Sequence, residues 1–162
     1  MMSEVADYKI VRNSLLGSEL TAEEAQQLAA RMCVQHFQNN EFLVKEGDLY
    51  RSLFLLAEGK LTVTSLNMQG EEKRVYTMKI GDCAGTRAFV KNSPRRATLR
   101  ADGATTVYTL TPEDLERLLE SHPRVAFKVM CALFRITHSN LARMSQESEQ
   151  LTNYITKMGG RY

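Results

Sequence analysis

The chain has 162 residues, of which 43% are hydrophobic and 25% are charged, and its formal net charge is +2. This is the composition of a soluble globular protein, and the length suffices for one well-buried core rather than two ordinary domains. The nearly neutral charge excludes a general affinity for polyanions, and no run approaches the roughly 18 apolar residues of a membrane span. The first residues include acids and lack an apolar segment, so no secretory signal is predicted.

The cysteines and histidines predict neither disulfides nor a metal site. Cys33, Cys83 and Cys131 are scattered and odd in number, which argues against a disulfide framework and favours a cytoplasmic location. They form no CxxC pair, and the three histidines show no ligand spacing with them. The sequence also lacks a GxSxG motif, a P-loop and a Cys–His arrangement, so we do not expect an enzyme.

A helix is predicted over residues 21–32, TAEEAQQLAARM. Thr21 is followed three residues later by Glu24, which is the pattern of a capping box. Apolar residues then recur at helical spacing, which indicates an amphipathic helix.

Residues 34–110 change to short alternating or β-branched runs, separated by turn sequences rich in Gly, Asn and Asp. The runs are VQHF (34–37), FLV (42–44), LFLL (53–56), LTVTSL (61–66), RVYTM (74–78), ATLRA (97–101) and TVYTL (106–110). Seven or eight strands at this spacing predict a mainly β fold with flanking helices, an antiparallel β-roll of the jelly-roll (double-stranded β-helix) kind.

The last third of the chain is predicted to be helical. Thr111 is a candidate N-cap with Pro112 at the first helical position, and this helix should run to about Glu120. Pro123 opens a second helix that should reach about Lys157, a length of roughly 50 Å. The expected organisation is a roll with its N-terminal helix over residues 1–122 and a dimerisation helix over residues 123–162.

The long helix carries an apolar stripe at alternating spacings of four and three, which is the a/d pattern of a coiled coil. Its members are Met130, Phe134, Thr137, Leu141, Met144, Ser148, Leu151, Ile155 and Met158. Val125, Val129 and Leu133 are expected to pack on the chain's own roll. Beyond Leu141 no folded mass remains to cover the stripe, so we predict a homodimer through this helix.

Two loops carry a more specific signal. Residues 81–89 read GDCAGTRAF, residues 93–98 read SPRRAT, and an EGD turn at residues 46–48 precedes Gly59. This spacing closely resembles the phosphate-binding cassette of cyclic nucleotide-binding domains, whose pattern is approximately GDxxGELAL…PRxAT. The resemblance extends to the long helix of the catabolite-activator group of that family.

The resemblance implies a ligand site for cyclic AMP, cyclic GMP or another phosphate-bearing nucleotide. Arg95 matches the arginine that binds the phosphate, Gly85 the cassette glycine, and Ala97 the small residue that follows the arginine. Asn140 lies about where the family's long helix covers the base. The candidate ligand-binding residues are Gly85, Thr86, Arg87, Ala88, Arg95, Arg96, Ala97 and Asn140.

Three cassette residues depart from the family pattern. Thr86 replaces the glutamate that accepts a hydrogen bond from the ribose, Arg87 replaces an apolar residue, and Arg96 replaces a small one. Loss of a hydrogen bond to a charged group costs about 1.5–3 kcal/mol, so recognition of an ordinary cyclic nucleotide should be weakened.

The segment is also basic, with no acid between Asp82 and Asp102; its cations are Arg87, Lys91, Arg95, Arg96 and Arg100. A solvated charged face explains this better than a pocket for a more negative ligand, such as a cyclic dinucleotide.

These observations bear on three possible functions. The first is a cyclic nucleotide-binding-like sensor that binds a small phosphate-bearing ligand and signals through its dimer helix. The alternative is a decayed, ligand-free structural or protein-docking dimer, favoured by Thr86, Arg87 and Arg96. The third is transcription regulation, but no residues follow the dimer helix to form a recognition helix, so we do not expect this chain alone to bind DNA.

Overall fold

The computed structural model describes residues 3–159, except for the side chains of residues 147, 148, 158 and 159. Two short helices come first, α1 (Tyr8–Arg12) and α2 (Ala22–Ala29). The predicted capping box is present, since the Glu24 N–H donates to Thr21 Oγ1 at 3.2 Å and the Thr21 N–H to Glu24 Oε1 at 3.0 Å. Helix α2 ends three residues earlier than predicted. Helix α1, which the sequence did not predict, is too short to display a helical period.

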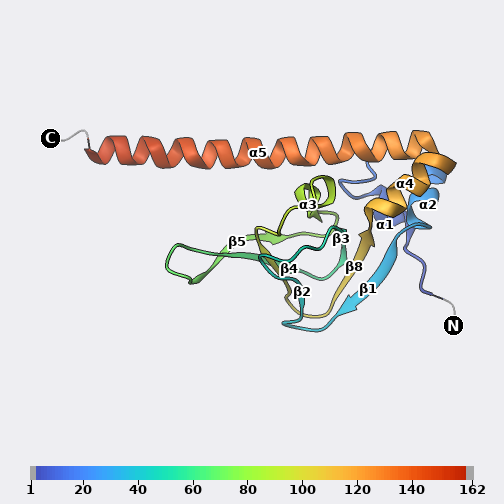
Figure 1. Cartoon of the computed structure of the whole chain (residues 1–162), viewed down its shortest axis with the longest axis horizontal. Helices are drawn as coiled ribbons and strands as arrows, with labels where there is room; N and C mark the ends of the chain where they lie inside the picture. Colours follow the sequence, from blue (N-terminus) through green and yellow to red (C-terminus); the bar gives the residue numbers. More distant parts are fainter. Residues whose placement is uncertain (1–2, 160–162) are drawn as a thin grey trace.

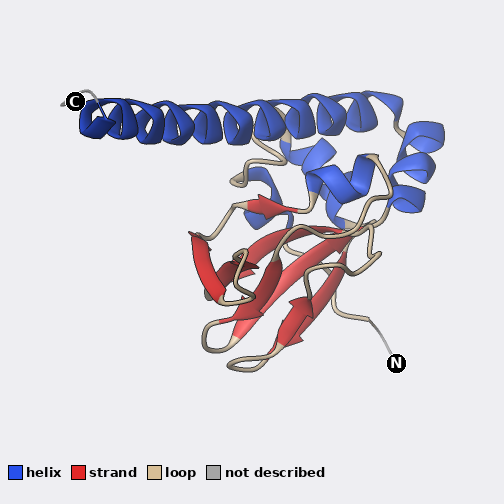
Figure 2. Ribbon diagram, turned by 60° about the vertical axis from the view of Figure 1, so that its left-hand side comes forward, coloured by secondary structure: helices blue, strands red, loops and turns tan. Residues whose placement is uncertain are grey.

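The middle of the chain forms two four-stranded antiparallel sheets (Figures 1 and 2). The strands are β1 (Cys33–Phe37), β2 (Phe42–Val44), β3 (Leu53–Glu58), β4 (Leu61–Leu66), β5 (Glu72–Met78), β6 (Cys83–Ala84), β7 (Thr98–Ala101) and β8 (Thr105–Leu110). Their order is β1-β8-β3-β6 in one sheet and β2-β7-β4-β5 in the other. All seven predicted strands are present, and the predicted β-roll is confirmed. The additional strand, β6, has only two residues and pairs with β3.

Strand β3 separates two hydrophobic cores. Its residues Leu53 and Leu55 pack among the helices, while Phe54 and Leu56 pack between the sheets against β4, β5, β7 and β8. All four side chains are almost fully buried. Because alternate side chains of a strand point to opposite faces, a strand buried on both faces has an uninterrupted apolar run. This explains the LFLL sequence.

The C-terminal helices are α4 (Pro112–Ser121) and α5 (Pro123–Gly159). As predicted, Thr111 caps α4 with Pro112 in its first turn. Val125, Val129 and Leu133 are buried in the core shared with α1 and α2, which confirms their predicted packing. Figure 1 shows α5 crossing above the short helix α3 (Thr86–Val90) and then extending past the β-roll.

The stripe along α5 is largely uncovered in the single chain. Phe134 is 75% exposed, and Leu141 and Leu151 are each 60% exposed. The side chains of Ser148 and Met158, and residues 160–162 at the end of the predicted dimerisation segment, lie outside the described residues. Within residues 3–159, no helix is long and apolar enough to cross a membrane.

Candidate ligand-binding site

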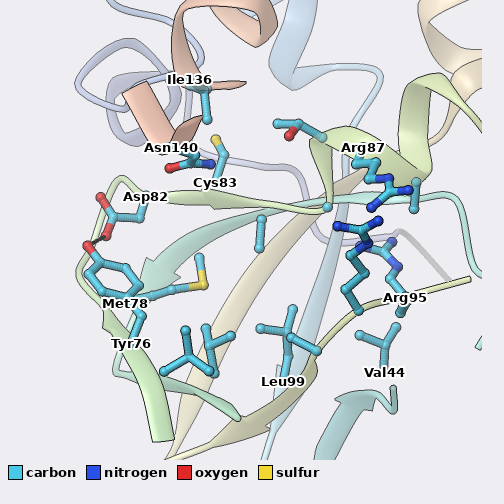
Figure 3. A pocket seen from close by; sticks show the side chains of 18 of the residues that line it. Val44, Tyr76, Met78, Asp82, Cys83, Arg87, Arg95, Leu99, Ile136 and Asn140 are labelled. Atoms are coloured by element: carbon cyan, nitrogen blue, oxygen red, sulfur yellow. Dashed lines mark hydrogen bonds between the residues drawn. The ribbon is translucent and has the colours of Figure 1, made fainter. Parts of the chain in front are cut away.

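A pocket of about 300 Å³ opens between the roll and α5. Its walls come from β2, β4, β5, β7 and the loop before it, the segment from β6 into helix α3 (Thr86–Val90), and α5. Apolar side chains form one wall, among them Val44, Met78 and Leu99 (Figure 3). A concave, mostly apolar pocket with a few polar groups is the usual form of a small-molecule site.

All eight candidate residues line this one pocket. They come from three segments that are separate in the sequence: residues 85–88, residues 95–97, and Asn140 on α5. Thr86, Ala88 and Arg95 are buried, Gly85 and Ala97 are partly buried, and Arg87, Arg96 and Asn140 are exposed. The structure therefore brings the predicted residues together, while their binding of a ligand remains a prediction.

Gly85 begins α3 in a conformation that requires glycine. Its φ is +93°, and a Cβ atom placed there would lie 2.1 Å from Arg95 Nη1. A side chain would thus be strained in the backbone and would collide with the guanidinium. The absence of a side chain at Gly85 is what allows Arg95 to lie directly against the start of α3.

Arg95 is held in place by backbone contacts. Its N–H donates to the Asp48 carbonyl at 2.9 Å, and its own carbonyl accepts from the Gly47 N–H at 2.8 Å. The side chain donates from Nε to the Tyr50 carbonyl at 2.7 Å and from Nη2 to the Ser52 carbonyl. These bonds fix the guanidinium while Nη1 remains beside Gly85.

The charge of Arg95 is buried and forms no ion pair with a described side chain, although the Asp48 carboxylate attracts it from a greater distance. The side chain is 6% exposed, and no carboxylate of the described side chains lies within 4.0 Å of it. Burial lowers the pKa of Arg95, yet an arginine remains charged at neutral pH. A buried charge is costly unless it is paired, so this site favours an anion.

Among the pocket residues that were not predicted as site residues, three form a polar group. The Tyr76 hydroxyl donates to Asp82 Oδ2 at 2.8 Å, and this bond raises the pKa of Tyr76. The guanidinium of Arg143 on α5 lies over the Tyr76 ring, 4.9 Å from its centroid. The sequence placed Asp82 in a turn, and Tyr76 and Arg143 had no motif to distinguish them. The approach of Arg143 to Tyr76 depends on how α5 crosses β5.

The pocket has two chemically different ends (Figure 3). Arg87 and Arg95 lie side by side at one end, whereas Tyr76 and Asp82 form the other, beneath Asn140. Cys83 also lines the wall, and burial raises the pKa of its thiol to about 12. The thiol is therefore protonated at neutral pH and is not an activated nucleophile.

Comparison with known proteins identifies the class that this fold and pocket define. The family model for the cyclic nucleotide-binding domain matches residues 34–122, more than half of the chain. The chain belongs to the cyclic nucleotide-binding domain family, whose domains are regulatory rather than catalytic.

Individual relatives agree with this assignment. The chain is 30% identical over 109 residues to a cGMP-dependent protein kinase of Eimeria tenella; the match covers 67% of this chain and 10% of the kinase. A cyclic nucleotide-binding domain from Methylobacillus flagellatus matches with a TM-score of 0.76 and 22% identity, over 91% of this chain and 81% of that one. The catabolite activator protein of Thermus thermophilus matches with a TM-score of 0.74 and 24% identity, over 86% and 63%. The chain thus spans about a tenth of the kinase, and the two structures confirm the predicted fold.

Proposed function

We propose that this chain is a regulatory sensor module that binds a small phosphate-bearing nucleotide at Gly85 and Arg95. The observation that carries the proposal is the buried guanidinium of Arg95, which has no carboxylate partner among the described side chains. The first N–H groups of α3, beside Gly85, have no acceptor within that helix. A phosphate bound there would accept from both and neutralise the buried charge.

Two of the similar proteins support a nucleotide ligand. One relative is a cGMP-dependent protein kinase, and one structural neighbour is a Toxoplasma gondii regulatory domain crystallised with cAMP. The pocket volume lies at the lower end of the range for small-molecule sites, which suits one mononucleotide. Asn140 then provides a polar contact from α5 to the part of the ligand farthest from Arg95.

The output of the proposed sensor is the position of α5. This helix lines the pocket through Ile136, Asn140 and Arg143, so a ligand there contacts it directly. The exposed stripe from Met130 to Ile155 would pair with the same stripe of a second copy. A cytoplasmic location is part of the proposal, supported by three cysteines that form no disulfide.

A ligand-free structural dimer is the second candidate. The bonds from Arg95 to the Tyr50 and Ser52 carbonyls favour it, because they would stabilise the loop with no ligand present. Thr86 also lacks the charged acceptor that the family pattern places after the glycine.

Native mass spectrometry separates the two candidates. The chain is purified at low salt, and its mass is measured before and after addition of a panel of cyclic and linear mononucleotides. The sensor predicts an added mass of one nucleotide per chain, which is lost in Arg95→Gln and retained in the exposed control Arg124→Gln. A spectrum with no adduct for any nucleotide would support the structural dimer.

A further inference from the structure

The two ends of the pocket differ in net charge. At one end, Tyr76 contacts both an anion and a cation. Its hydroxyl donates a hydrogen bond to Asp82, and its ring lies under the guanidinium of Arg143. One negative and one positive charge balance there. At the other end Arg87, Arg95 and Arg96 line the pocket, and none of the three has an ion pair with a described carboxylate.

Position 86 adds to this imbalance. Thr86 is the first residue of α3, is 8% exposed, and lines the pocket between Gly85 and Arg87. The family pattern has a carboxylate at this position, which would repel a strongly negative ligand. The neutral hydroxyl of Thr86 does not. The residues that line the pocket at the Gly85 end therefore contribute three positive charges and no negative charge. Asp48 does not line the pocket, and its carboxylate attracts the Arg95 charge from beyond ion-pair distance.

From this charge distribution we infer that the preferred ligand carries a dianionic phosphate monoester, as in a nucleoside 5′-monophosphate, rather than a 3′,5′-cyclic phosphodiester. The inference rests on the proposed function and specifies its ligand. A monoester loses its second proton with a pKa of about 6 and carries nearly two charges at pH 7, whereas a cyclic diester carries one. A pocket of about 300 Å³ suits one nucleotide, which favours a single nucleotide as the source of both charges over two linked nucleotides.

The exposure of the arginines indicates how much more tightly a monoester should bind than a cyclic diester. Arg87 and Arg96 are exposed, so each should add only about two- to fivefold in affinity for one further negative charge. Arg95 is buried and already attracts the first charge. Together these contributions predict that a monoester binds about tenfold more tightly than the cyclic diester of the same base.

Titration calorimetry at pH 8 and fixed salt tests this with eight ligands, the 5′-monophosphates and 3′,5′-cyclic monophosphates of adenosine, guanosine, cytidine and uridine. At least one base should show the monophosphate binding about tenfold more tightly than its cyclic form. Equal or tighter binding of the cyclic forms would overturn this inference and leave the proposed function intact. No binding of any of the eight at millimolar concentration would overturn the proposed function itself.

Variants then test whether the arginines cause the preference. Arg87→Gln with Arg96→Gln should reduce the ratio between the two ligands to about twofold, with cyclic nucleotide affinity changing less. Arg124→Gln with Arg135→Gln removes two exposed arginines that do not line the pocket, and should leave the ratio unchanged. A ratio that persists in the first double variant, or tighter binding of a cyclic dinucleotide than of any monophosphate, would refute the assignment.

Discussion

At the scale of single residues, Gly85 and Thr86 have separate consequences for the pocket. Gly85 has a positive φ and leaves room for Arg95, so the contact between α3 and the guanidinium is preserved. Thr86 offers a hydroxyl where the family pattern has a carboxylate. The chain thus retains the part of the site that would bind phosphate and lacks the part that would bind a ribose hydroxyl.

Replacing Thr86 with glutamate should therefore improve binding of cyclic AMP. A restored acceptor for the ribose should raise affinity about tenfold or more, on the scale of a hydrogen bond to a charged group. Thr86→Glu with Arg96→Ala is the companion variant, because it also removes a side chain that the family pattern does not place there. Titration with cyclic AMP and cyclic GMP at one salt concentration measures the gain.

The exposed change Thr152→Glu on α5 is the control for added charge and should have no effect. Tight binding of cyclic AMP by the parent protein would contradict the role given to Thr86. Binding of cyclic AMP and cyclic GMP by neither Glu variant would show that the missing carboxylate is not what weakens cyclic nucleotide binding, and would favour the ligand-free dimer only if the monophosphates also fail to bind.

The sequence predicted the phosphate end of the pocket better than the other end. Residues 85–88 and 95–97 match the cassette pattern of the family, and that resemblance implied that they lie together. Tyr76 and Asp82 bond to each other within the segment from β5 to β6, but Arg143 reaches them only because α5 passes over this segment, and no local pattern encodes that approach. Nor did the sequence reveal that Arg95 is anchored by two backbone carbonyls while lacking a described carboxylate partner.

At the scale of elements, the sequence predicted the helices and strands that are long enough to show a periodic pattern or a cap. It did not predict the shortest ones. The seven longer strands and helices α2, α4 and α5 have a period or a cap that is visible in the sequence. Strand β6 and helix α1 contain two and five residues, which is too few to show a period. Strand β6 exists because residues 83–84 pair with β3, a contact that depends on the tertiary fold.

The cap of α2 should contribute measurably to stability. Thr21 accepts from the Glu24 N–H, so Thr21→Ala leaves that donor without its partner. We expect a loss of about 1 kcal/mol in the free energy of unfolding, measured by urea denaturation. Thr21→Ser retains the hydroxyl and should be close to the parent. An Ala variant as stable as the parent would show that the cap is not needed.

Glu24 also joins α2 to α5, through a bond from Lys128 Nζ to its carboxylate at 2.6 Å. This bond lowers the pKa of Glu24 below its ordinary value of 4.5. A lowered folded-state pKa adds stability above the unfolded-state pKa, and this is lost as the pH falls through the folded-state value.

Glu24→Gln should accordingly destabilise the protein by about 0.5 kcal/mol at pH 7, the scale of a partly exposed ion pair. The difference from the parent should shrink as the pH falls below 4.5. Urea denaturation at pH 7, 5 and 3.5 measures it, with the exposed Glu23→Gln as control. A difference that is constant over this range would contradict a contribution from the ionised carboxylate.

At the scale of the whole molecule, α5 connects the pocket to the surface through which we expect two chains to associate. Its first part is buried in the core, its middle lines the pocket, and its end carries the exposed stripe beyond the β-roll (Figure 1). In the proposed sensor, a change in pocket occupancy would alter the angle or pairing of the stripe without rearranging the sheets.

The predicted homodimer can be tested at the centre of the stripe. Leu141→Lys with Leu151→Lys places like charges at facing positions of a parallel pair and should yield monomers in sedimentation equilibrium. Gln146→Lys with Asn153→Lys adds the same charge at positions facing away from the stripe, and should leave the dimer intact. Dimers of unchanged affinity in the first variant would refute this interface.

The central claim is that a phosphate-bearing nucleotide binds at the unpaired charge of Arg95. The most direct test is a calorimetric titration of the parent protein and of Arg95→Gln with the ligand that binds the parent most tightly. Loss of a charge-assisted contact at a desolvated site should weaken binding by about 2–4 kcal/mol. Circular dichroism would establish that the variant is folded, since Arg95 also bonds to the Tyr50 and Ser52 carbonyls. The account predicts that a folded variant loses binding while Arg124→Gln retains it. A folded Arg95→Gln protein with an unchanged dissociation constant would contradict it, because the ligand would then bind elsewhere.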